Sequence, residues 1–125
     1  MPAVFRPRSQ GDRQAVQREQ DRARGSAAER GYDSRWRKAS RSHLTRSPLC
    51  RYCEVDAWGE GRAVTAATLV DHLFPHRSDT VLFWSTEWWV SSCKACHDGP
   101  KQAVERAGGR GLDRLADLLG LPPRS

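Results

Sequence analysis

Two closely spaced pairs of cysteines set the strongest limit on what this chain can fold into. Cys50 and Cys53 form one C-x-x-C pair, and Cys93 and Cys96 form a second pair 39 residues further along. Each tight turn presents two thiolates, and four thiolates are a common tetrahedral ligand set for Zn²⁺. Compact zinc ribbons separate their pairs by only about 15–20 residues. The spacing therefore predicts a structural zinc site that joins two distant segments, with a folded insert between them.

A zinc staple suits the composition of the chain. The 125 residues are 38% hydrophobic and 29% charged, so burial supplies only a modest core, whereas metal binding adds folding free energy directly. The sequence has no uninterrupted apolar run of about 18 residues and no apolar secretory segment at its start. We therefore expect no membrane partner and a reducing cytoplasmic location, where four cysteines bind metal more often than they form disulfides.

The excess positive charge is confined to the N-terminal part of the chain. Residues 1–47 contain twelve Lys or Arg and five Asp or Glu, a balance of +7, whereas residues 48–125 contain nine and ten, a balance of −1. A basic, Arg-rich arm favours a polyanionic partner, because each phosphate that it neutralises releases condensed counterions. The alternative is a solvated, disordered tail without a partner, and composition alone favours neither.

Local patterns outline the elements around the cysteines. Residues 1–31 lack a clear apolar period, which predicts an arm that is disordered or a frayed helix. The other expected elements are a helix over 34–46 capped by Ser34, a strand over 63–74 ended by Pro75, a helix over about 98–107 with Pro100 in its first turn and ended by Gly108 and Gly109, and a short helix over 112–120. The chain then divides into an arm at 1–31, a central domain at 32–108 and a C-terminal tail at 109–125.

The second cysteine pair also permits other chemistries. Cys93 to His97 spells C-x-x-C-H, which is typical of c-type haem attachment. Haem attachment requires export, and Met1, the single methionine, is a poor candidate for the sixth ligand. A thioredoxin-like redox pair would leave the other C-x-x-C unexplained, and no βαβ pattern surrounds either pair. Structural zinc is therefore the interpretation that we prefer to haem.

Adjacent acidic and histidine residues stand at the end of the expected strand. Neighbouring strand residues point to opposite faces, so Asp71 and His72 can serve one site only if the strand ends or bends there. Pro75 favours such an end. The alternative is a surface aspartate beside a half-buried, hydrogen-bonded histidine.

Taken together, these segments resemble a known nuclease family. The segments are VDHLFPHRSD at 70–79, LFW at 82–84, EWW at 87–89 and CKACHD at 93–98, preceded by SPLCRYC at 47–53. From about Tyr32 to Lys101 the chain is similar to the HNH endonucleases, in particular the small phage and prophage type encoded beside DNA-packaging genes. The resemblance implies a small α+β fold of the ββα-metal type, in which two strands and a helix surround one catalytic divalent ion. Here the motif would be stapled by the four-cysteine zinc site and preceded by the basic arm.

The resemblance also implies roles for three residues. His72 matches the general base that deprotonates the attacking water, and Asp71 and His97 match the ligands of a catalytic Mg²⁺ or Mn²⁺. The implied activity is hydrolysis of DNA phosphodiester bonds, by nicking or by double-strand cleavage, to 5′-phosphate and 3′-hydroxyl ends. Elementary chemistry agrees, because neutral imidazole accepts a proton near pH 7 and a hard cation stabilises a departing oxygen.

One position departs from the family pattern. Trp88 stands where the motif has an Asn that helps to orient the catalytic histidine, and Trp cannot supply the same amide hydrogen bonds. Either a neighbour such as Glu87 takes this role or activity is reduced. His76, Arg77 and Lys94 lie near the motif and are candidates for contacting phosphate or positioning the site, with solvated surface groups as the alternative.

Two functions of other classes stay open at the level of sequence. A non-catalytic, zinc-stapled module would bind DNA without cutting it, and Trp88 is its best support. A packaging accessory protein would act through contacts with phage terminase and portal proteins, with the leucines of residues 112–120 as a docking helix. For a phage-encoded chain, the expected location is the cytoplasm of the bacterial host.

Overall fold

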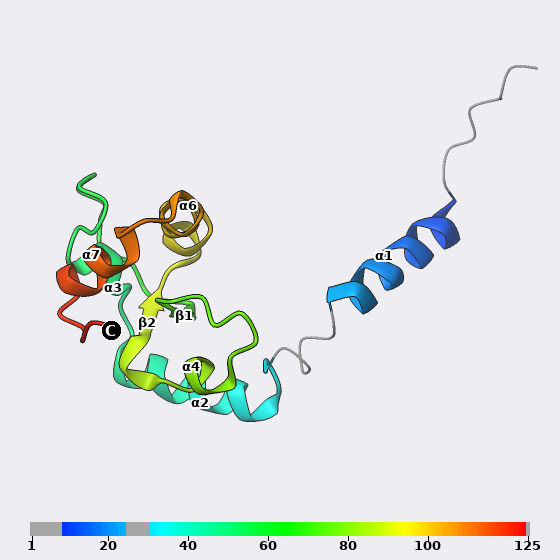
Figure 1. Cartoon of the computed structure of the whole chain (residues 1–125), viewed down its shortest axis with the longest axis horizontal. Coiled ribbons are helices and arrows are strands. Elements are labelled where there is room, and N and C mark those ends of the chain that lie inside the picture. Colours follow the sequence, from blue (N-terminus) through cyan, green and yellow to red (C-terminus); the bar gives the residue numbers. More distant parts are fainter. Residues whose placement is uncertain (1–8, 25–30, 125) are drawn as a thin grey trace, which may run out of the picture.

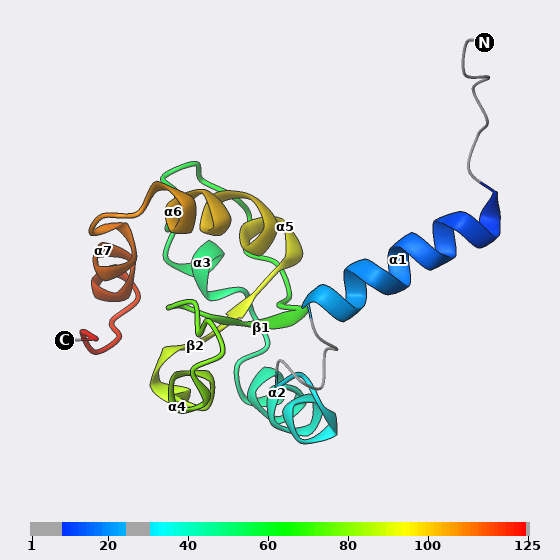
Figure 2. The same cartoon turned by 45° about the vertical axis from the view of Figure 1, so that its right-hand side comes forward.

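A two-stranded antiparallel sheet lies at the centre of the fold (Figures 1 and 2). The structure, a computed structural model, describes residues 9–24 and 31–124. Strands β1 (Leu69–His72) and β2 (Trp89–Ser92) pair so that Leu69 lies opposite Ser92 and His72 lies opposite Trp89. The chain is thus a small α+β protein with a two-stranded sheet, as the resemblance implied. The local patterns predicted only the first of these strands.

The first strand is much shorter than the expected strand over 63–74. Only residues 69–72 face a partner strand. The preceding segment instead runs beside the first cysteine pair, where Ala66 forms an isolated bridge with Leu49 and the Cys50 amide donates to the Thr65 carbonyl at 2.9 Å. The Val and Thr content of this segment favours extended backbone, but a longer strand needs a longer partner.

Helix α2 (Ser34–Arg46) has the expected bounds and packs on β1. Its N-cap is Asp33 rather than Ser34, because the Asp33 carboxylate accepts a hydrogen bond from the Trp36 amide at 3.0 Å. A side-chain oxygen in this position satisfies an amide that has no partner within the helix. The ring of Trp36 is buried.

A continuous helical stretch follows β2 and starts earlier than the expected residue 98. It comprises α5 (Lys94–Cys96), a π-helical turn η2 (His97–Lys101) and α6 (Gln102–Ala107). Pro100 lies in the π-helical turn. Proline has no backbone N–H to donate, and a π-helical turn replaces the i→i+4 hydrogen bonds of an α-helix with i→i+5 hydrogen bonds. Gly108 ends the stretch with φ of 67°, as expected from its freedom in this region.

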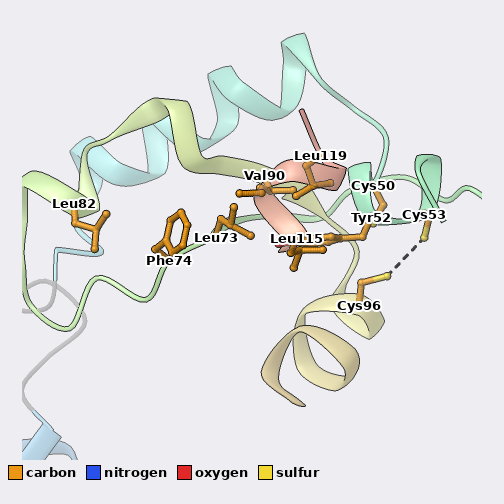
Figure 3. Close-up of a cluster of buried hydrophobic side chains, with 11 residues drawn as sticks. Cys50, Tyr52, Cys53, Leu73, Phe74, Leu82, Val90, Cys96, Leu115 and Leu119 are labelled. Atoms are coloured by element: carbon orange, nitrogen blue, oxygen red, sulfur yellow. Dashed lines mark hydrogen bonds between the residues drawn. The ribbon is translucent and has the colours of Figure 1, made fainter. Parts of the chain in front are cut away.

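The remaining short helices close the core. They are α3 (Arg51–Glu54), α4 (Thr80–Phe83), a 3₁₀ turn η1 (Thr86–Trp88) and α7 (Gly111–Leu118). Figure 3 shows one core cluster, in which Leu115 of α7 and the following Leu119 pack with Tyr52 and Val90. These two leucines are therefore buried in the protein's own core, whereas Leu118 of the same helix is exposed. A second cluster, which includes Trp36, Phe83 and Trp89, packs α2 and α4 against the sheet.

The N-terminal arm contains helix α1 (Gln10–Arg24), which stands apart from the sheet in both views (Figures 1 and 2). A reciprocal cap begins it, because the Ser9 amide donates to Asp12 at 3.2 Å and the Asp12 amide donates to Ser9 at 3.1 Å. The rest of the expected arm, residues 1–8 and 25–30, lies outside the described residues. No helix among the described residues is long and apolar enough to cross a membrane.

Candidate functional site

The four cysteines lie together at one end of the sheet. Their sulfur atoms are all within 4.8 Å of one another, and Cys53 Sγ lies 3.7 Å from Cys96 Sγ (Figure 3). A tetrahedral ion with metal–sulfur distances of about 2.3 Å would space its ligands about 3.8 Å apart. Cys50 and Cys93 cap the starts of α3 and α5, so each helix start presents one pair. The cluster could hold a metal ion such as zinc, as the spacing predicted.

Two donors from the insert contact the sulfur cluster. Trp58 Nε1 donates to Cys96 Sγ at 3.3 Å, and an Arg62 guanidinium nitrogen lies 3.8 Å from the same sulfur. Such hydrogen bonds offset the negative charge that four thiolates place on a divalent ion. Nothing in the local sequence pattern identified Trp58 or Arg62 as neighbours of the cluster.

A separate cleft of about 610 Å³ gathers most of the other candidate residues. Asp71, His72, His76, Arg77 and His97 all line it. The remaining candidate, Lys94, is not among its lining residues and instead pairs with Asp98 on the exposed side of α5. The cleft thus brings together residues from β1, from the segment after it and from the helical stretch that follows β2.

The Asp71 carboxylate is buried and its two oxygens face different partners. Tyr52 donates to Oδ2 at 2.6 Å, and the ammonium of Lys101 lies 3.2 Å from the same oxygen. Oδ1 instead faces His97 Nε2 at 3.7 Å. Burial raises the pKa of Asp71, and the charge of Lys101 opposes part of that rise.

The His97 ring is oriented from its other side. Its Nδ1 lies 2.9 Å from an oxygen of Asp98. A carboxylate at Nδ1 fixes the tautomer of an imidazole and directs Nε2 outward, here toward Asp71. Asp98 was not among the expected site residues, although a residue directly following a candidate histidine is one place to look for such a partner.

His72 lies on the opposite face of the sheet from Asp71. Its ring stacks on Trp36, with centroids 4.9 Å apart and an interplanar angle of 22°, and Nε2 lies 3.0 Å from the Phe83 carbonyl. A carbonyl only accepts, so Nε2 carries the proton and Nδ1 keeps its lone pair. Burial, followed by the charge of His76, lowers the pKa of His72 to about 4.

The free edge of β1 explains how neighbours on opposite faces share one cleft. The sheet has only two strands, so the edge of β1 away from β2 is unpaired by any other strand in the described part of the chain. The cleft runs along this edge, since residues 68–72 all line it. The sequence expectation that the strand must end or bend is thus met by an edge strand that ends at His72.

Lys101 is a site residue that the sequence did not identify. Its side chain is 1% exposed, and its ammonium contacts Asp71, a Glu105 oxygen at 2.5 Å and the His72 carbonyl at 3.2 Å. The only sequence signal was a Lys and a Glu four residues apart, a spacing common on exposed helix surfaces.

Trp88 has a packing role. Its ring meets Phe74 edge to face at 5.3 Å, and its Nε1 donates to the Pro122 carbonyl at 2.8 Å. Glu87 is exposed, and among the described contacts neither residue forms a hydrogen bond with His72. The Phe83 carbonyl contacts His72 instead, and it also accepts from Trp89 Nε1 at 3.0 Å.

The fold and the sulfur cluster define a small α+β protein with a site able to hold a metal such as zinc. Comparisons with protein-family models, curated proteins and solved structures found no match.

Proposed function

We propose that this protein is a metal-dependent DNA endonuclease of the HNH type, with the four-cysteine cluster as its structural metal site. One observation carries the proposal. Asp71 Oδ1 and His97 Nε2 lie 3.7 Å apart in a cleft that His72 also lines. The order of elements, two antiparallel strands followed by a helix, supports it, because β1 holds the first two residues and the helical stretch holds the third.

The residues fit a hard divalent cation. Two ligand atoms that each lie about 2.1 Å from one ion are at most about 4.2 Å apart, and the separation of Asp71 Oδ1 and His97 Nε2 is within that limit. Lys101 occupies Oδ2 and leaves Oδ1 available. Asp71 and His97 would hold Mg²⁺ or Mn²⁺, which would supply charge stabilisation to the phosphate and to the departing 3′ oxygen.

His72 performs the proton transfer in this proposal. The attacking water gives a proton to His72 Nδ1 as its oxygen bonds to phosphorus, and the bond from phosphorus to the 3′ oxygen breaks. The 3′ oxygen takes up a proton from solvent, so the products are a 5′-phosphate and a 3′-hydroxyl. Stacking on Trp36 and the bond to the Phe83 carbonyl hold the imidazole in one orientation, which general base catalysis requires.

A plasmid-nicking assay with Mg²⁺ or Mn²⁺ tests the proposal. We expect His72→Gln to lose at least about 100-fold in rate, because a positioned general base contributes about 10²–10⁴-fold. His43→Gln is the matched control, since His43 lies on α2 and lines a different hollow. Zinc content and circular dichroism should match the unchanged protein in both variants. Equal nicking by the two variants would remove His72 from the mechanism.

A second candidate function is DNA binding without cleavage. The observation that favours it is the Lys101 ammonium, which already neutralises part of the charge on the Asp71 carboxylate and so weakens its attraction for a cation. In that case the unchanged protein binds DNA in a salt-sensitive manner but nicks no plasmid at any concentration of Mg²⁺ or Mn²⁺.

A further inference from the structure

Most of the net positive charge upstream of the cysteines belongs to one short helix. Residues 1–30 contain seven Arg and four Asp or Glu, a balance of +3. Helix α2 contains five basic residues and no acidic residue, a balance of +5. The basic residues are Arg35, Arg37, Lys38, Arg41 and Arg46, and all five are exposed. The strongest local source of positive charge is therefore a folded element packed against the sheet.

Two adjacent rows of residues on α2 have different surroundings. Trp36, Ser40 and Leu44 follow one another at intervals of four residues, and all three line the cleft that contains Asp71 and His72. Arg37 and Arg41 form the neighbouring row, because they precede Ser40 and Leu44 by three residues and residues three apart are neighbours on a helix surface. The two arginines therefore lie directly beside the wall of the cleft.

The surface continues from the cleft onto these arginines. A shallow hollow of about 420 Å³ is lined by Arg37, Ser40, Arg41, Leu44 and Thr45. Ser40 and Leu44 line both this hollow and the cleft, so they form the rim between them. A polymer that leaves the cleft over this rim meets the two guanidinium groups next.

Not all of the charges on α2 have partners within the described part of the protein. Arg35 lies over the Trp84 ring at 4.6 Å and Arg46 donates to Ser42, but the guanidinium groups of Arg37 and Arg41 form no ion pair or hydrogen bond with any described residue. Like charges spaced four residues apart on a helix repel each other. An external anion would relieve that repulsion, and a phosphate backbone supplies anions in a row.

We propose that Arg37 and Arg41 of α2 bind the phosphate backbone of duplex DNA where it leaves the cleft. The inference rests on the proposed nuclease function. It adds a binding surface for the part of the DNA that flanks the cleavage site. The arginines act by neutralising phosphates, so their contribution is independent of base sequence and decreases with added salt.

Binding of a short labelled DNA duplex to the full chain tests the inference. Fluorescence anisotropy is measured across a salt series without added Mg²⁺ or Mn²⁺ and without chelator, so that the cysteine-bound metal stays in place. The test protein carries Arg37→Gln and Arg41→Gln. The control carries Arg110→Gln and Arg114→Gln, which removes the same charge from exposed positions at and within α7.

The expected result is a change in the salt dependence of the test protein alone. Its slope of log affinity against log salt should fall in magnitude by about 1.8, for two phosphate contacts at about 0.9 each, and its affinity near 0.1 M salt should fall at least about tenfold. Equal slopes for the test and control proteins would overturn the inference, as would absence of binding by the unchanged protein. Tighter binding of duplex RNA, with the same loss on mutation, would overturn the assignment to DNA.

The outcome is separable from that of the nicking assay. If the unchanged protein nicks plasmid through His72 while the Arg37/Arg41 protein keeps its slope, the nuclease proposal stands and the inference fails. If the slope changes but no nicking is seen, α2 is a DNA-binding surface of a protein that does not cut.

Discussion

Two lysines in the same helical stretch show how differently one residue type can act. Lys94 is exposed and pairs with Asp98 at the surface, whereas Lys101 is buried between Asp71 and Glu105. A surface ion pair gains little because water already solvates both charges. A buried charge without its partner has neither water nor a counterion, which is why removing one member of a buried pair is strongly destabilising.

Lys101→Met should therefore destabilise the fold far more than Lys94→Met. We expect a loss of about 3 kcal/mol in the free energy of unfolding for Lys101→Met, because Asp71 and Glu105 lose a shared cation. For Lys94→Met the expected loss is below about 1 kcal/mol. Urea unfolding with zinc present measures both values. Equal midpoints for the two variants would contradict the buried position of Lys101.

At the scale of elements, the sulfur cluster joins parts of the chain that have few other reasons to stay together. Helices α3 and α5 contain four and three residues and are too short to be stable alone. Each starts at a cysteine of the cluster, and Trp58 and Arg62 of the insert contact it as well. A metal ion at the cluster would hold both helix starts and the insert in one place.

Removal of that ion should unfold the central part of the protein. We expect one zinc per chain and a melting temperature that falls on treatment with a chelator, because metal binding by such a site is coupled to folding. Zn²⁺ should restore the melting temperature and Mg²⁺ should not, since four thiolates are poor ligands for a hard cation. An unchanged melting temperature in the chelated protein would show that the cluster is not a structural metal site.

At the scale of the whole molecule, helix α1 is separate from the part that carries both sites. It stands away from the sheet in Figures 1 and 2, and the described side chains of residues 11–19 are exposed except for Val16, which is half-buried. A helix with so little burial contributes little to the stability of the rest. The exposed side chains of Arg13 and Arg18 are available to solvent or to a polyanion.

Deleting residues 1–30 should therefore leave the melting temperature of the remaining chain unchanged. The same deletion should weaken DNA binding by less than the Arg37/Arg41 replacement, because the deleted segment carries a net charge of only +3 and none of its described residues lines the cleft. Calorimetry and anisotropy on the shortened chain measure the two effects. A large drop in melting temperature would show that the arm is part of the folded unit.

Features that depend on neighbouring residues were predictable from the sequence. The extent of α2, the end of α6 at Gly108 and the existence of α7 all followed from local signals, although the N-cap of α2 is Asp33 and not the predicted Ser34. The cysteine pairs predicted a metal-binding cluster because each pair is itself a local turn. Asp71, His72 and His97 line one cleft. No local pattern predicted that they lie close together, and their expected roles came from the family resemblance alone.

Features that depend on partners distant in sequence were decided only by the tertiary structure. The length of β1 followed from the length of β2, and the shared cleft of Asp71 and His72 followed from the free edge of a two-stranded sheet. The burial of Lys101 likewise depends on the helical stretch packing beside β1. The sequence by itself determined the local turns, caps and cysteine spacing, because their interactions are short in range. Strand pairing and charge burial need groups that only folding brings into contact.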